Sequence, residues 1–129
     1  MRLGLKMLNS SSSLNAISYL NQVLINPNDT ATVMFQLVDL DQGGQRYIPA
    51  TGAMVTINLT SINIANNIMK IPTNPFSDDR SVWAFNLLAS ETAVAAGVNM
   101  KVTLTQGADV KSATAEGVVI FGSQSKYSC

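Results

Sequence analysis

The chain has 129 residues, with 8 basic and 8 acidic side chains, one cysteine and no histidine. This length is typical of one domain that can bury a core of its own. The basic residues are scattered and the net charge is zero, so we expect no nucleic-acid partner. Without histidine the commonest general base is missing, together with every Ser-His-Asp arrangement, so we expect a protein that is not an enzyme.

Residues 1–13 are expected to form a flexible arm. Their apolar run is interrupted by Lys6 and followed by the polar segment Asn9-Ser10-Ser11-Ser12-Ser13. It is too short for a signal peptide or a membrane span, so we expect no membrane partner. Because a flexible segment can become ordered on a neighbouring chain, Leu3, Leu5 and Leu8 are candidate partner contacts.

Period-two alternation predicts strands along the first half of the chain. Residues 14–25 fit both a helix and a strand, and we favour a strand that ends at Ile25, because Asn26-Pro27-Asn28-Asp29 is a strong turn signal. Residues 30–40 alternate in polarity and end at an acidic glycine turn, 41–44. Further strands are expected at residues 47–49, 53–64 and 68–71.

The second half of the chain continues the pattern. Strands are expected at residues 81–88, 100–104 and 110–121, with one short helical crossover at residues 90–97 that Ser90 begins and Gly97 ends. This predicts a single all-β sandwich of about seven strands over residues 14–122, with a polar tail at 123–129. The predicted core consists of the residues on one face of each strand, which are Val33, Phe35, Leu37, Val55, Ile57, Leu59, Trp83, Phe85, Leu87, Val102 and Leu104.

Two carboxylate pairs are the only candidates for acid–base or metal chemistry. Asp39 and Asp41 precede Gly43-Gly44, and Asp78 and Asp79 are adjacent in a predicted loop. Aspartate is a common turn former. The first pair also lacks the later ligands of a calcium loop, because Ala50 stands where a bidentate glutamate belongs. We therefore expect turns at both places, no catalytic residue, no metal and no cofactor.

Several apolar residues lie off the predicted core face. Met34 and Met54 are out of register with it, and Val118 and Ile120 belong to a final strand that is apolar on both faces. A strand with two apolar faces needs cover on both sides. These four residues are therefore candidate partner contacts as well. Trp83 and Phe85 could instead form a sugar-stacking platform, but their alternation is typical of core aromatics.

The order of the signals resembles a known group of domains. It begins with Asn28–Asp41 and Gly43-Gly44, continues through Ile48-Pro49 and residues 53–59, and closes with Trp83-Ala84-Phe85-Asn86-Leu87, Ser90-Glu91-Thr92, Gly97 and Val102-Thr103-Leu104-Thr105. Over about residues 20–121 this resembles the immunoglobulin-like domains of tailed-bacteriophage virion proteins. It is similar to those of baseplates, tail adaptors and fibre attachment proteins, and among these to the amino-terminal domain of upper baseplate proteins.

The resemblance implies a structural protein of the virion, in the tail rather than the capsid, whose partners are other virion proteins and copies of itself. Only 12% of the residues are charged, about half the usual share, and such a surface costs less to desolvate. Two alternatives stay open. One is a capsid decoration protein of the same kind of particle, and the other is a carbohydrate-binding or adhesion module, for which Tyr19, Tyr47, Phe76 and Tyr127 are the plausible exposed aromatics.

Overall fold

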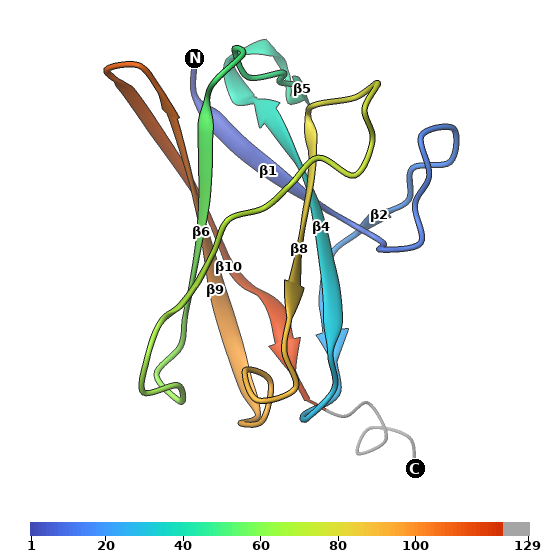
Figure 1. The fold of residues 1–129 in the computed structure, drawn as a ribbon, viewed down its shortest axis with the longest axis vertical. Coiled ribbons are helices and arrows are strands. Elements are labelled where there is room, and N and C mark those ends of the chain that lie inside the picture. Colours follow the sequence, from blue (N-terminus) through green and yellow to red (C-terminus); the bar gives the residue numbers. More distant parts are fainter. Residues whose placement is uncertain (123–129) are drawn as a thin grey trace.

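The computed structural model describes residues 1–122 and shows an all-β sandwich of two five-stranded sheets (Figure 1). The strands are β1 (Leu3–Leu8), β2 (Tyr19–Leu20), β3 (Val23–Ile25), β4 (Ala31–Asp39), β5 (Gln45–Arg46), β6 (Met54–Thr60), β7 (Ile68–Lys70), β8 (Val82–Leu87), β9 (Ala96–Gln106) and β10 (Asp109–Phe121). One 3₁₀ turn, η1 (Leu40–Gln42), follows β4.

Strand β4 is the centre of the first sheet. It pairs antiparallel with β1 on one side and with both β8 and β5 on the other, while β2 pairs with β1. The second sheet has the order β3-β10-β9-β6-β7. All its pairs are antiparallel except β3 with β10, which run parallel.

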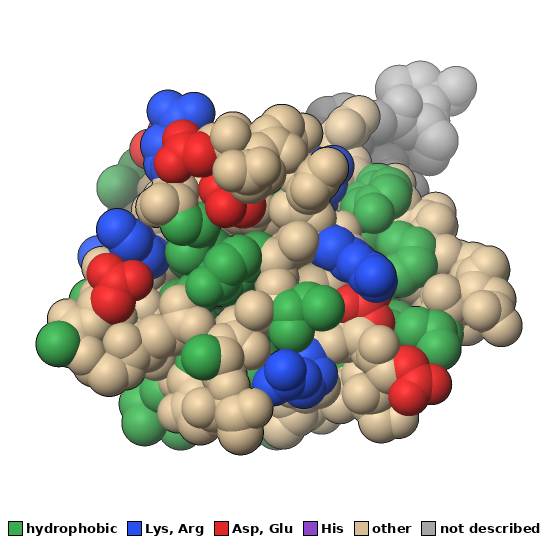
Figure 2. All heavy atoms as spheres, turned by 90° about the horizontal axis from the view of Figure 1, so that it is seen from above, with side chains coloured by type: hydrophobic (Ala, Val, Ile, Leu, Met, Phe, Trp, Pro, Cys, Tyr) green, Lys and Arg blue, Asp and Glu red, His purple; other side chains and the backbone are tan. Residues whose placement is uncertain are grey.

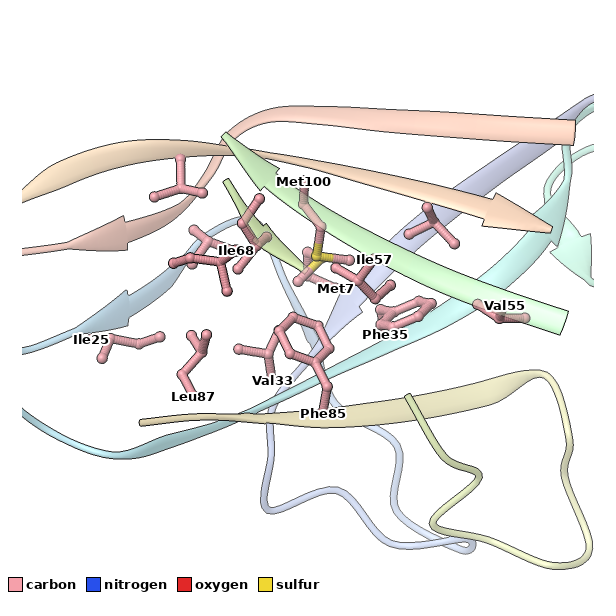
Figure 3. Packing of buried hydrophobic residues seen from close by; sticks show 14 of the residues in the cluster. Met7, Ile25, Val33, Phe35, Val55, Ile57, Ile68, Phe85, Leu87 and Met100 are labelled. Atoms are coloured by element: carbon pink, nitrogen blue, oxygen red, sulfur yellow. The ribbon is translucent and has the colours of Figure 1, made fainter. Parts of the chain in front are cut away.

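The main core fills the space between the two sheets (Figure 3). Phe35 and Phe85 meet there with ring centroids 6.3 Å apart and tilted planes, and Met100 packs from the opposite sheet. Of the eleven predicted core residues, ten are buried in this cluster, and Trp83 is half-buried against it. Period-two alternation predicted these core residues because successive side chains of a strand point to opposite faces, whichever strand lies beside it.

A second, smaller cluster covers the outer face of the first sheet. Leu8, Met34 and Val82 are buried there, and Ile17, Phe76 and Ala84 pack against them. Ile17 and Phe76 come from the long connections 9–18 and 71–81, which cross this face (Figure 1). Strand β4 is therefore buried on both faces, from Val33 to Val38.

The expectation of a flexible arm at residues 1–13 is wrong. Residues 3–8 form β1, which pairs with β4 along its whole length, from Leu3 opposite Asp39 to Leu8 opposite Met34. Leu3 and Leu8 are buried within the chain, and Leu5 packs against the main core. The sandwich therefore begins at residue 3 and not at residue 14, because alternate apolar residues of this segment complete the core.

The predicted helical crossover at residues 90–97 is also wrong. The chain makes turns from residue 89 to 91, and Ala96 and Gly97 already belong to β9. One helical turn gains too few hydrogen bonds to offset the cost of nucleation. Here the Glu91 side chain accepts a hydrogen bond from the backbone N–H of Leu88 and stabilises the turn instead.

Candidate functional site

The predicted carboxylate pairs form turns and ion pairs. The Asp39 carboxylate accepts a hydrogen bond from the backbone N–H of Asp41 and starts η1, which ends at Gly43 with a φ of 70°. Asp41 lies 3.7 Å from both the amino terminus and the Arg2 guanidinium. Within residues 1–122, no three Asp, Glu, Cys or His side chains gather as a metal site would require.

Asp79 belongs to a buried polar network on the outer face of the first sheet. Its carboxylate accepts from both the N–H and the hydroxyl of Ser81, and lies 3.3 Å from Arg46. The Gln36 side chain donates to Ser81 Oγ and accepts from the Tyr19 hydroxyl. Ser81 is fully buried and Asp79 nearly so. The network therefore holds the connection 71–81 on the sheet.

The candidate partner contacts from the sequence are dispersed. Met34 is buried in the second cluster, so its assignment as a partner contact is wrong, as it is for buried Leu3 and Leu8. Val118 packs against the main core and Ile120 is half-buried. Met54 is 60% exposed and stays a candidate. The predicted partner contacts do not form one surface, because other parts of the same chain cover most of them.

The aromatic residues considered for a glycan platform do not gather on one surface. Phe85 is buried in the main core and Phe76 packs in the second cluster on the opposite side of that sheet. The Tyr19 ring lies under the Lys6 ammonium, 5.3 Å from the ring centroid. The Tyr47 hydroxyl accepts a hydrogen bond from Gln106. Tyr127 lies outside the described residues.

One end of the sandwich gathers three loops, two of which carry exposed apolar side chains. They are residues 26–30 between β3 and β4, residues 61–67 between β6 and β7, and residues 88–95 between β8 and β9, at the lower end in Figure 1. Ile62 is 101% exposed, Leu88 57% and Val94 52%. We call these 26–30, 61–67 and 88–95 segments the loop end.

Side-chain contacts hold the 88–95 segment of the loop end. Lys70 Nζ, at the end of β7, lies 2.7 Å from Glu91 Oε1, and the same oxygen accepts from the Leu88 N–H at 2.8 Å. The Thr92 hydroxyl, which is fully buried, donates to the Asp29 carbonyl at 2.8 Å. The loop 88–95 is therefore tied to the β7 edge on one side and to the β3–β4 turn on the other.

The electrostatics of the Glu91 carboxyl reflect this anchoring. Burial raises its pKa, but the hydrogen bond from Leu88 and the neighbouring Lys70 ammonium act in the opposite direction and outweigh it. The pKa of Glu91 therefore lies below its ordinary value of 4.5. At neutral pH the loop end thus contains a satisfied ion pair, and the remaining charged residue of its three segments is Asp29.

The opposite end of the sandwich differs in charge. It contains the amino terminus, η1, β5 and the β9–β10 turn, and four of the five ion pairs found in the described residues lie there. Figure 2 looks onto this end and shows acidic and basic side chains next to one another around hydrophobic ones. Among the described residues, ion pairs are therefore concentrated at this end, and the three segments of the loop end contain only Asp29 and Glu91 as charged residues.

Sequence reasoning missed the loop end. Ile62 and Ile64 alternate with Ser61 and Asn63, so the sequence favoured a strand through residue 64, although they lie out of phase with Val55, Ile57 and Leu59. In the structure β6 ends at Thr60, and Ser61 accepts hydrogen bonds from Asn63 and Ile64 that turn the chain. The signal that could have found this turn is the change of phase at Ser61, because a continuous strand keeps the apolar residues of one face two positions apart.

Comparisons of the chain with protein-family models, with curated proteins and with solved structures found no match. Among the described residues, no helix is long and apolar enough to cross a membrane. A functional interpretation therefore depends on the fold, on the surface of the loop end and on the resemblance noted in the sequence.

Proposed function

We propose that this chain is a non-enzymatic structural protein of a tailed-bacteriophage virion, a tail, baseplate or fibre-attachment component that docks to neighbouring subunits. The observation that carries the docking role is the loop end, where Ile62, Leu88 and Val94 are exposed and the 88–95 segment is anchored through Glu91. An exposed apolar patch on a soluble domain is a common mark of an interaction site. Anchored loops also lose little conformational entropy when they bind.

The strand order supports the resemblance to immunoglobulin-like domains. Strands β1-β4-β8 have the order of strands A-B-E in such a domain, and β6-β9-β10 have the order C-F-G. Strand β7, beside β6, takes the place of the additional strand C′ of variable-type domains. Because fold does not imply function, the assignment to a virion rests on the resemblance and needs a direct test.

Density-gradient fractionation of the source material provides that test. Each fraction is digested and this chain is quantified against the major particle proteins by peptide mass spectrometry. A fixed ratio to the major proteins in the particle band is expected. A chain that stays with the soluble proteins at the top of the gradient would refute the proposal.

The same measurement separates the tail from the capsid. A tail or baseplate component is present in few copies, whereas a capsid decoration protein is present in a ratio close to that of the major capsid protein. Negative-stain microscopy of particles decorated with an antibody to this chain gives the position independently. We expect labelling at the tail, and labelling over the head would indicate the decoration protein.

A further inference from the structure

We propose that the free edge of β10 is a self-association site, where β10 of a second copy of this chain pairs antiparallel about a two-fold axis. This site is separate from the loop end and goes beyond the proposed function. It begins with an unpaired length of backbone. Within residues 1–122, β9 pairs with one side of β10 from Asp109 onward, whereas β3 pairs with the other side only at residues 119–121.

The hairpin turn shows which backbone groups point to the free edge. Gly107 and Ala108 form a two-residue turn between Gln106 and Asp109, and Gly107 has a positive φ of 61°, as in a type II′ turn. The two residues that flank such a turn exchange hydrogen bonds, and bonded and non-bonded pairs then alternate along the strands. The N–H and C=O groups of residues 109, 111, 113 and 115 therefore face β9, and those of 110, 112 and 114 point away from it.

These outward groups have no strand beside them in the part of the chain that the structure describes. Val110, Ser112 and Thr114 are exposed, and their backbone makes no hydrogen bond with another strand or turn. Strand β1 packs near β10 without pairing with it. A row of unpaired N–H and C=O groups is completed by an extended polypeptide. The chemistry of this edge therefore identifies its partner as another strand.

The free edge of β10 is also the longest in the described residues. It has seven residues, 109–115, which matches a strand of typical length, about 5–6 residues. Strands β2, β3 and β7 have only two or three residues each. The outer edge of β8 is bridged by Thr73 at Ala84. A strand that adds to this molecule thus finds its most complete template at β10.

Side-chain contacts hold both ends of this edge in place. At the turn, the Gln106 side chain accepts a hydrogen bond from the Ala50 N–H and donates one to the Tyr47 hydroxyl. At the other end, the bulge of β10 is fixed by the Asn99 side chain, which accepts from the Gly117 N–H. An edge that is already ordered loses little conformational entropy when it pairs.

The register identifies the added strand as a second β10. The seven residues are centred on Ser112, so a two-fold axis there places Ser112 opposite itself and Val110 opposite Thr114 of the second copy. All outward N–H and C=O groups of residues 110, 112 and 114 then meet one another. Lys111 lies opposite Ala113 of the second copy and keeps its own ion partner, Asp109, at 3.7 Å. Such a contact uses one edge twice and closes as a dimer.

The ends of the paired region fit this register. The turn of the second copy comes to lie beside residues 116–117, and β3 begins only opposite Val119. In Figure 1 the tip of the β9–β10 hairpin stands out from the neighbouring strands at the upper left. Seven residues a side are fewer than the roughly 20–30 of a standard interface, so we expect a weak dimer, which a high local concentration would strengthen.

Ser112→Pro tests the backbone pairing directly. Proline has no N–H to donate, and it is tolerated in edge strands where that N–H faces solvent. Because the Ser112 N–H points away from β9, the variant keeps the hairpin and loses two hydrogen bonds per dimer. We expect dimerisation to weaken by about 10–100-fold. Ser112→Ala is the matched control, because it keeps the backbone donor and is expected to dimerise as the wild type does.

A pair of charged variants tests the register and does not depend on tolerance of proline. Ser112→Asp and Ser112→Lys each place like charges opposite one another at the axis and should weaken dimerisation several-fold. A mixture of the two variants should form a heterodimer that is tighter than either homodimer. The control is Met54→Asp, which lies on the outer face of the same sheet, two strands from the edge and 60% exposed. It is expected to leave dimerisation unchanged.

The experiment is sedimentation equilibrium of the full chain up to millimolar concentration, with native mass spectrometry of the mixed variants. Circular dichroism checks that each variant is folded. Amide hydrogen exchange, followed by NMR, gives an independent readout. We expect the amides of residues 110, 112 and 114 to become protected as the concentration rises, whereas those of 111, 113 and 115 are protected at every concentration.

Three results would overturn the inference. The first is a wild-type chain that stays monomeric at millimolar concentration. The second is a dimer that Met54→Asp dissociates and the Ser112 variants do not, which would place the contact on the sheet face. The third is protection of the 110, 112 and 114 amides in the monomer, which would show that another segment of the same chain covers this edge.

The outcomes distinguish this inference from the proposed function. A monomeric chain that still bands with particles refutes the pairing of β10 and leaves the virion assignment in place. A dimer that depends on Ser112 but is absent from the particle band refutes the virion assignment and leaves the pairing in place.

Discussion

Lys70, the last residue of β7, and Glu91, in the connection between β8 and β9, are 21 positions apart in sequence, and their Nζ and Oε1 atoms are separated by 2.7 Å. Both side chains are mostly buried, at 19% and 22% exposure. Glu91 also accepts the Leu88 N–H, so one carboxylate fixes its own turn and attaches that turn to β7. The contact is a natural place to test how the loop end is held.

This contact predicts a pH dependence of stability. The folded-state pKa of Glu91 lies below its ordinary value of 4.5, so its contribution is fully present above that pH and is lost as the pH falls through the lowered folded pKa. Glu91→Gln should cost about 1 kcal/mol at pH 7 and much less at pH 3. Urea unfolding of both proteins at the two pH values measures this, and an equal difference at both would contradict it.

The N-terminal strand is predicted to be essential to the fold. Deletion of residues 1–8 removes β1 and the buried side chains of Leu3, Met7 and Leu8, and exposes the edge of β4. We expect an unfolded or aggregated chain, measured by circular dichroism and by the dispersion of amide signals in NMR spectra. A milder test is Leu8→Ala, which should cost about 2–5 kcal/mol. A folded deletion variant of unchanged stability would contradict the structure.

The buried network around Ser81 gives a third prediction. Ser81→Ala removes the partner of the Gln36 amide and one partner of the Asp79 carboxylate, and leaving buried polar groups unsatisfied costs about 1–3 kcal/mol. Thr32→Ala is the matched control. The Thr32 hydroxyl also donates to a side chain of the neighbouring strand, Asn86 of β8, but this hydrogen bond lies at an exposed site. Its effect should stay within about 0.5 kcal/mol. If chemical denaturation shows that both variants lose the same free energy of unfolding, the buried network does not add to stability and the prediction is wrong.

The irregularity in β10 gives a fourth prediction. The pairing of β10 with β9 shifts register between Ala115 and Val119, and Gly117 within this bulge has a φ of 65°. A Cβ at Gly117 would meet no atom within 4 Å, so the cost of Gly117→Ala is backbone strain alone, about 1–2 kcal/mol. Gly97→Ala, in neighbouring β9, has equal space and no positive φ. We expect it to be tolerated, and thermal melting of the two variants compares them.

The sequence alone predicted the main strands and the main core. In β6 the inward residues Val55, Ile57 and Leu59 are buried and Met54 points outward, as period-two alternation requires. This pattern is readable because the two faces of a strand follow from backbone geometry and do not depend on which strand lies beside it. The acidic glycine turn after β4 was readable for a similar local reason.

Tertiary structure decided what the sequence could not. Strand β1 exists because β4 pairs with it across more than 25 positions, and a short apolar segment interrupted by Lys6 gives no local sign of such a partner. Met34 is covered because two distant connections fold over it. Ile62 is exposed because β6 ends at Thr60 and the chain turns at Ser61, and no other segment within residues 1–122 covers it. Local periodicity determines which way a side chain points, but only the packing of distant segments determines whether anything lies there to meet it.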